Sequence, residues 1–92
     1  MPTIKVNQAH NKPLPEVRDI ANDIAAKLKD SYDVSSSWKN DTQLSFKRTG
    51  LSGDLNITDS SVAIKLDLSF LLSSFKSTIE QRIREQLEQK LA

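Results

Sequence analysis

His10 is the only histidine in this chain of 92 residues, and its imidazole is the side chain best suited to acid–base chemistry near neutral pH. The chain contains no cysteine, which excludes disulfides, thiolate metal sites and cysteine nucleophiles. With one histidine, a metal site built on a histidine pair is also excluded. His10 lies in a proline-flanked loop before a predicted helix. We predict that it is a surface or helix-start residue that makes hydrogen bonds, and an isolated general base is the alternative.

Two features could suggest nucleic-acid binding, and neither has the required context. The segment Gly50–Gly53 resembles the GxxG loop of KH domains, but it lies between predicted strands where that loop joins helices. A hairpin with glycines at positive φ is therefore favoured. The net charge of +1 gives no general attraction to nucleic acid. The open face of the predicted sheet also lacks the aromatic residues of an RNA recognition motif. It carries Ser35, Ser37, Gln43, Ser45, Lys47, Asp54, Asn56, Thr58, Ala63, Lys65 and Asp67.

The remaining candidates for chemistry are carboxylates and aromatic residues. Asp54, Asp59 and Asp67 are spread over predicted strands and turns without the spacing of a calcium loop. The aromatic residues all fall on the predicted core-facing side of their strands and helices. We therefore favour packing in the core over the lining of a ligand cavity. We therefore predict no catalytic, cofactor-binding or metal-binding residue and no cofactor. The aromatic residues in question are Trp38, Phe46, Phe70 and Phe75.

The elements that must position these residues follow from the spacing of apolar side chains. Alternation predicts strands at about 3–8, 33–38, 42–48, 53–58 and 61–68. Spacings of three and four predict a helix over 15–32 and a long helix over 69–91. A capping-box pattern near Ser77 makes a break there an alternative, and a single helix is preferred.

This order, β-α-β-β-β-β-α, predicts one domain over residues 1–92 with an α+β fold. The architecture is a two-layer sandwich, in which an antiparallel meander is covered on one face by two helices in a helix-grip-like layout. Its sheet register predicts two groups of residues. Lys47, Asn56 and Lys65 should be exposed, and Phe46, Ile64 and Leu66 should be buried.

The C-terminal end of the long helix is a candidate contact surface. Its apolar residues repeat every four positions from Phe75 to Leu91, so the stripe drifts around the helix by roughly 40° per step. The helix would also be longer than a six-residue strand. We therefore predict that the last apolar residues extend beyond the sheet and stay partly exposed; the alternative is that they fold back over the first helix or fray. The predicted contact residues are Ile83, Leu87 and Leu91.

The assembled pattern covers almost the whole chain and resembles a known family. It comprises His10 before an amphipathic helix, Trp38 at the end of a strand, the segments Leu44–Gly53 and Leu68–Lys76, and then Ile79, Glu80 and Ile83. This pattern is similar to that of the polyhydroxyalkanoic acid system proteins, small bacterial proteins linked to polyhydroxyalkanoate granule regions. The resemblance implies an accessory role in storage-polyester metabolism at the granule surface, with no established activity, and it does not identify an active site.

Two functions are therefore carried forward. The first is a non-enzymatic protein that binds a polyester granule or a granule protein, with a homodimer as a further candidate assembly. The alternative is a small helix-grip-like binder of an apolar, acyl-type ligand. We expect a cytoplasmic location, because Met1 to Gln8 lack the features of a secretory signal and no stretch of the chain is apolar enough to form a transmembrane segment.

Overall fold

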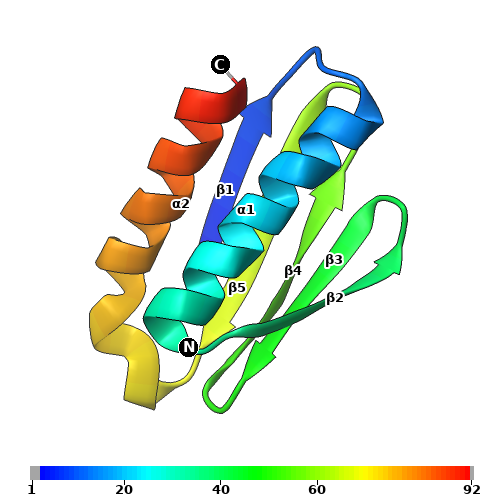
Figure 1. The fold of residues 1–92 in the computed structure, drawn as a ribbon. Coiled ribbons are helices and arrows are strands. Elements are labelled where there is room, and N and C mark those ends of the chain that lie inside the picture. The colour runs from blue at the N-terminus through cyan, green and yellow to red at the C-terminus, as the bar shows by residue number, and fades with distance from the viewer. Residues whose placement is uncertain (1–2, 92) are drawn as a thin grey trace.

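A five-stranded antiparallel sheet with two helices on one face forms the molecule (Figure 1). The structure is a computed structural model that describes residues 3–91. In chain order its elements are β1 (Thr3–Ala9), α1 (Leu14–Tyr32), β2 (Ser35–Asn40), β3 (Gln43–Arg48), β4 (Leu51–Ile57), β5 (Ser61–Leu68), a 3₁₀ helix η1 (Phe70–Phe75) and α2 (Lys76–Leu91). The sheet order is β1-β5-β4-β3-β2. The predicted α+β sandwich and the four-strand meander are confirmed.

The strand register follows the period-two pattern. Leu55 pairs with Leu44 on one side and with Ile64 on the other, so one apolar row crosses three strands beneath the helices. Because alternate side chains point to opposite faces, the intervening residues face solvent. Both predicted groups are confirmed: Lys47, Asn56 and Lys65 are exposed, and Phe46, Ile64 and Leu66 are buried.

The two glycines of the segment Gly50–Gly53 have different roles. Gly50 lies in the β3–β4 turn with φ +86°, which a glycine adopts without steric cost. Gly53 lies inside β4, where a Cβ would collide with the main-chain oxygen of Lys65. The hairpin is therefore confirmed, but only Gly50 has a positive φ, and β4 begins at Leu51, two residues before the predicted start.

The edge strand β2 is less well covered than its sequence pattern predicts. Only Trp38 of this strand is partly buried, and Ser36 on the same face is exposed. The indole Nε1 donates to Asn22 Oδ1 at 3.0 Å, and the guanidinium carbon of Arg18 lies 4.5 Å from the centre of the ring. Trp38 thus joins β2 to α1 at the rim of the core, where it is half-buried and packs against the core side chains.

The predicted long helix over 69–91 is two elements. The main chain at Ser69 is extended, and its N–H donates to Gly50 O at 2.8 Å before η1 begins. Within η1 only Leu72 is buried. The break falls between Phe75 and Lys76, close to the alternative near Ser77, and the chain turns after β5 at Ser69.

Because α2 is shorter than the predicted helix, it does not form the predicted contact surface. The sixteen residues of α2 span about 24 Å at the usual rise, close to the roughly 23 Å of the seven-residue strand β1. The helix therefore packs along β1 without extending beyond it, and an apolar stripe of four residues drifts by only about 120°. Leu87 is 1% exposed and Leu91 is 4% exposed. The prediction that Ile83, Leu87 and Leu91 form an exposed contact surface is wrong, since all three are core residues.

Candidate contact surface and interhelical groove

His10 holds a loop in place. Its Nδ1 accepts a hydrogen bond from the Lys12 N–H at 3.1 Å, and its Nε2 lies 2.9 Å from Thr58 O. Since a carbonyl can only accept, Nε2 carries the ring proton and donates it to Thr58. The His10 main-chain N–H also donates to Ser60 O at 2.9 Å. The predicted hydrogen-bonding role is confirmed, and both ring nitrogens are occupied by main-chain groups.

The aspartates of the sheet are paired with neighbours on the same face. Asp67 accepts a hydrogen bond from Thr3 Oγ1 at 2.9 Å. Asp54 accepts from the amides of Gln43 and Asn56, each at 3.3 Å. Within residues 3–91, no three histidine or acidic side chains gather closely enough to hold a metal ion.

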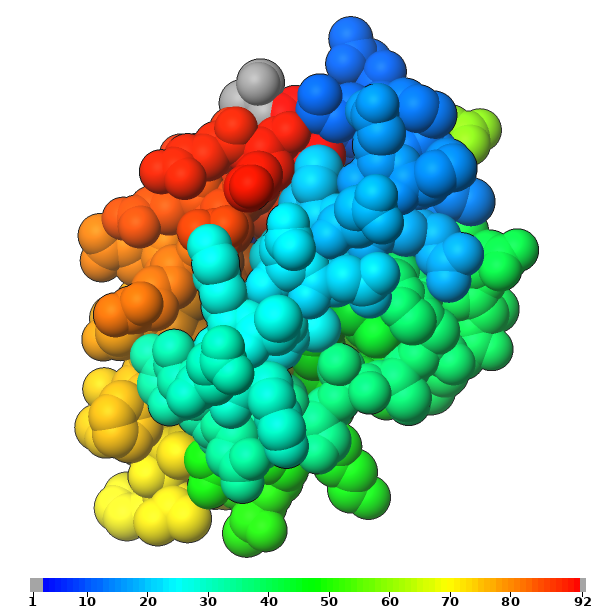
Figure 2. All heavy atoms as spheres, in the orientation of Figure 1, coloured from blue at the N-terminus to red at the C-terminus, as the bar shows by residue number. Residues whose placement is uncertain are grey.

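Three large apolar side chains are exposed on η1, and we call them the apolar patch: Phe70, Leu71 and Phe75. Their exposed fractions are 91%, 66% and 45%, respectively. The predicted core positions of Phe70 and Phe75 are therefore wrong, whereas that of Phe46 is confirmed. Figure 2 shows η1, in yellow, at one end of the molecule beside the C-terminal end of α1 and the β3–β4 turn.

Packing and hydrogen bonds hold the segment that carries the apolar patch in place. Leu72 is buried between the exposed residues, and the Ser73 hydroxyl donates to Phe70 O at 2.9 Å. The ring of Phe75 packs edge-on against Tyr32, with ring centres 6.2 Å apart. Arg48 in turn donates to the Tyr32 main-chain oxygen, which links the end of α1 to β3. The exposed side chains thus project into solvent from a segment that is anchored to the rest of the fold.

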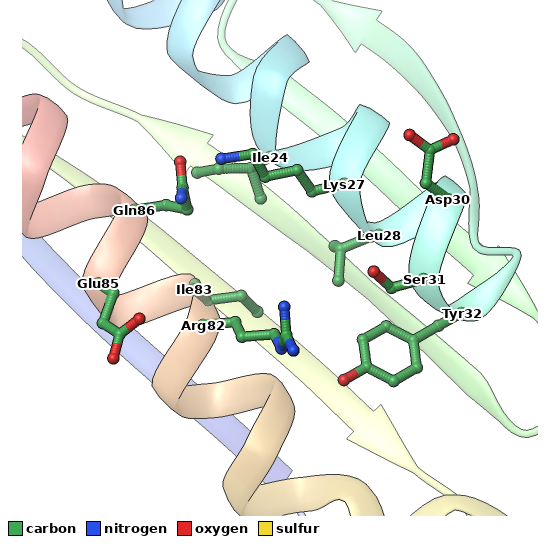
Figure 3. Close-up of a pocket in the computed structure, with 10 residues that line it drawn as sticks. All are labelled: Ile24, Lys27, Leu28, Asp30, Ser31, Tyr32, Arg82, Ile83, Glu85 and Gln86. Carbon is green, nitrogen blue, oxygen red and sulfur yellow. The ribbon is translucent and has the colours of Figure 1, made fainter.

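A groove runs between α1 and α2 on the outer side of the helical layer (Figure 3). Its volume is about 350 Å³. The buried side chains of Ile24, Leu28 and Ile83 contribute apolar surface to it. Figure 3 shows Arg82 of α2 and Tyr32 of α1 pointing toward one another across the groove. It is lined by Ile24, Lys27, Leu28, Asp30, Ser31, Tyr32, Arg82, Ile83, Glu85 and Gln86.

Comparison with known families matches nearly the whole chain to a family model. The family model described as "putative polyhydroxyalkanoic acid system protein" matches residues 4–91. The chain belongs to this family. The match runs from β1 to the last residue of α2, so the apolar patch and the groove both lie within the family's domain. No curated protein matches the chain.

Among residues 3–91, no helix is long and apolar enough to cross a membrane. The apolar patch is the feature that reasoning from the sequence missed. One signal could have found it: Phe70, Leu71 and Leu72 are consecutive, and a helix turns by about 100° per residue, so all three cannot face one core. The groove has no comparable signal, because its walls come from helices far apart in the sequence.

Proposed function

We propose that this protein is a non-enzymatic accessory protein of polyhydroxyalkanoate granules in the cytoplasm, and that it binds the granule surface through the apolar patch. The observation that carries the proposal is the exposure of Phe70, Leu71 and Phe75 on one short anchored helix. Membership of the polyhydroxyalkanoic acid system family supports the choice of the apolar polyester as the partner.

The energetics favour such a contact. Burying a large apolar side chain is worth about 1.5–3 kcal/mol relative to leaving it in water. Single exposed apolar residues are common on protein surfaces, but a group of them usually marks a binding site. Since Leu72 and Tyr32 hold the segment in place, little conformational entropy is lost when the patch binds.

The polar groups support a role without catalysis. Both nitrogens of His10 bind main-chain groups, so the imidazole is engaged in holding a loop. The aspartates Asp54 and Asp67 accept hydrogen bonds from neighbouring strands. Side chains in these arrangements stabilise the fold, and the apolar patch is the surface that we assign to granule binding.

Cosedimentation with polyhydroxyalkanoate granules tests the proposal. In the double variant Phe70→Ser/Leu71→Ser, a loss of about 1.5 kcal/mol per side chain corresponds to about a tenfold weaker binding for each. The control is Leu14→Ser, because Leu14 is an exposed leucine on α1, outside the patch. Equal binding of the wild type and the double variant would overturn the proposal.

Two further measurements identify other partners of the patch. Granules stripped of their proteins should bind the wild type with the same affinity as native granules. Binding to native granules alone would indicate a granule protein as the partner and would contradict direct contact with the polyester. Light scattering at increasing concentration should show a monomer. A dimer that the double variant abolishes, without a change in granule binding, would assign the patch to self-association.

A further inference from the structure

We propose that the groove between α1 and α2 binds a short aliphatic hydroxy acid, the monomer class of the polyester. The carboxylate would lie at Arg82 and the Tyr32 hydroxyl, and the ligand hydroxyl would donate to Gln86, beside the Lys27 ammonium. The choice of ligand class rests on the proposed granule role, but the groove is separate from the apolar patch and can be tested without granules.

The size and lining of the groove fit a small molecule with an aliphatic chain. A volume of about 350 Å³ is near the lower end of the range for small-molecule sites, which favours one monomer over a length of polymer. Ile24, Leu28 and Ile83 offer branched aliphatic surface for the chain. The space between the helices and the sheet, in contrast, is filled by the core side chains.

The charges in the groove are arranged for an anion. Arg82 and Lys27 form no ion pair with any of the residues 3–91, so both cations are available. Figure 3 shows Lys27 extending from α1 toward α2, and Arg82 pointing toward Tyr32. The two carboxylates of the lining, Asp30 and Glu85, point away from the space between the helices.

Glu85 has a partner of its own, because it accepts a hydrogen bond from Gln81 Nε2 at 3.2 Å. The groove therefore presents the Arg82 guanidinium and the Tyr32 phenol to a bound carboxylate, and the Lys27 ammonium adds positive charge near Gln86. Charge-assisted hydrogen bonds of this kind are the stronger class in proteins, and a guanidinium matches the two oxygens of a carboxylate.

Gln86 selects for a hydroxyl on the ligand. Its Oε1 is shielded from solvent and accepts no hydrogen bond within the described part of the chain. A buried acceptor without a donor is costly, so a ligand that supplies a donor gains affinity. The terminal amide torsion of glutamine is broad, which allows the oxygen to turn toward a donor that enters the groove.

The spacing of the two α2 residues fits a hydroxyl close to a carboxylate. Arg82 and Gln86 are four residues apart, so they lie on one face of α2 with Cβ atoms about 5–6 Å apart. A carboxylate and a hydroxyl two carbons away can reach both side chains at once. A plain fatty acid would leave the Gln86 oxygen without a donor.

Calorimetric titration with three probes tests the inference: 3-hydroxyoctanoate, octanoate and 3-octanol. We expect 3-hydroxyoctanoate to bind about tenfold more tightly than octanoate, since one hydrogen bond distinguishes them, and 3-octanol to bind still more weakly. Equal affinity for 3-hydroxyoctanoate and octanoate would overturn the role of the hydroxyl. Absence of binding by all three would overturn the site.

Matched variants locate the site. Arg82→Gln should weaken 3-hydroxyoctanoate binding about tenfold or more, whereas Arg84→Gln, a change at an exposed arginine outside the groove, should leave it unchanged. Gln86→Leu should reduce the affinity for 3-hydroxyoctanoate to that for octanoate, and Gln89→Leu should not. Equal effects of a variant and its control would show that the ligand binds elsewhere.

Granule binding separates this inference from the proposed function. Phe70→Ser/Leu71→Ser should lose granule binding and keep 3-hydroxyoctanoate binding. A wild type that cosediments with granules but binds none of the probes would overturn the groove inference and leave the proposed function standing. The reverse pattern would overturn the granule proposal and keep the ligand site.

Discussion

The ring of Tyr32 packs edge-on against the ring of Phe75, with centres 6.2 Å apart and planes inclined at 62°. Tyr32 is the last residue of α1, and Phe75 is the last residue of η1. This contact joins the end of one helix to the segment that carries the apolar patch. Tyr32 also lines the groove, so one side chain connects the two candidate surfaces.

The first prediction concerns this aromatic pair. A double-mutant cycle with Tyr32→Leu and Phe75→Leu should give a coupling energy of about 0.5–1.5 kcal/mol, as is usual for edge-to-face pairs. The measurement is urea unfolding of the four proteins. Tyr32→Phe retains the ring and should be close to the wild type in stability. Strictly additive effects of the two leucine substitutions would show that the rings do not stabilise each other.

The second prediction separates core leucines from patch leucines. Leu87→Ala should lower the free energy of unfolding by about 2–5 kcal/mol, because it leaves a cavity beside β1. Leu71→Ser, at an exposed position of the same residue type, should change it by less than about 0.5 kcal/mol. Thermal or urea unfolding measures both. A small effect at Leu87 would place this residue at the surface and restore the contact surface predicted from the sequence.

The third prediction ranks the two glycines. Gly53→Ala should destabilise the protein more than Gly50→Ala, because its Cβ would meet the main chain of β5, which cannot move aside without disturbing the sheet. In Gly50→Ala, the alanine would have to adopt the left-handed conformation of Gly50, which costs roughly 1–2 kcal/mol. Its Cβ would lie 2.8 Å from the Ser69 hydroxyl, which can rotate away. Unfolding in urea gives the order, and Thr49→Ala in the same turn is the control. The opposite order would contradict the close approach of β4 and β5.

The fourth prediction tests the role of His10. His10→Ala removes two hydrogen bonds to main-chain groups and should lower the free energy of unfolding by about 1–3 kcal/mol. The lost contacts should appear as faster amide exchange at Lys12. Granule binding and 3-hydroxyoctanoate binding should be unchanged, because the loop lies outside the patch and the groove. A loss of either activity with an unchanged stability would give His10 a direct functional role.

The helix α1 and the inner faces of β3, β4 and β5 could be predicted from the sequence because their patterns are local. Apolar residues three and four apart define the buried side of α1, and period-two alternation defines which side of each strand is buried. The hairpins also follow from short turns between these strands. The place of β1 beside β5 was not predictable in this way, since it depends on pairing between residues about sixty positions apart, such as Val6 with Ile64.

Tertiary structure alone decided what the last quarter of the chain exposes. The spacing from Phe75 to Leu91 is the same whether the helix extends past the sheet or ends with it. Which of these two helix lengths forms depends on the turn after β5. The hydrogen bond from the Ser69 N–H to Gly50 O fixes this turn, so that the helix is shorter and Phe70 and Leu71 face solvent. The groove likewise exists only where α1 and α2 pack side by side. Local spacing determines which face of an element is apolar, whereas the lengths and positions of its neighbours determine how much of that face is covered.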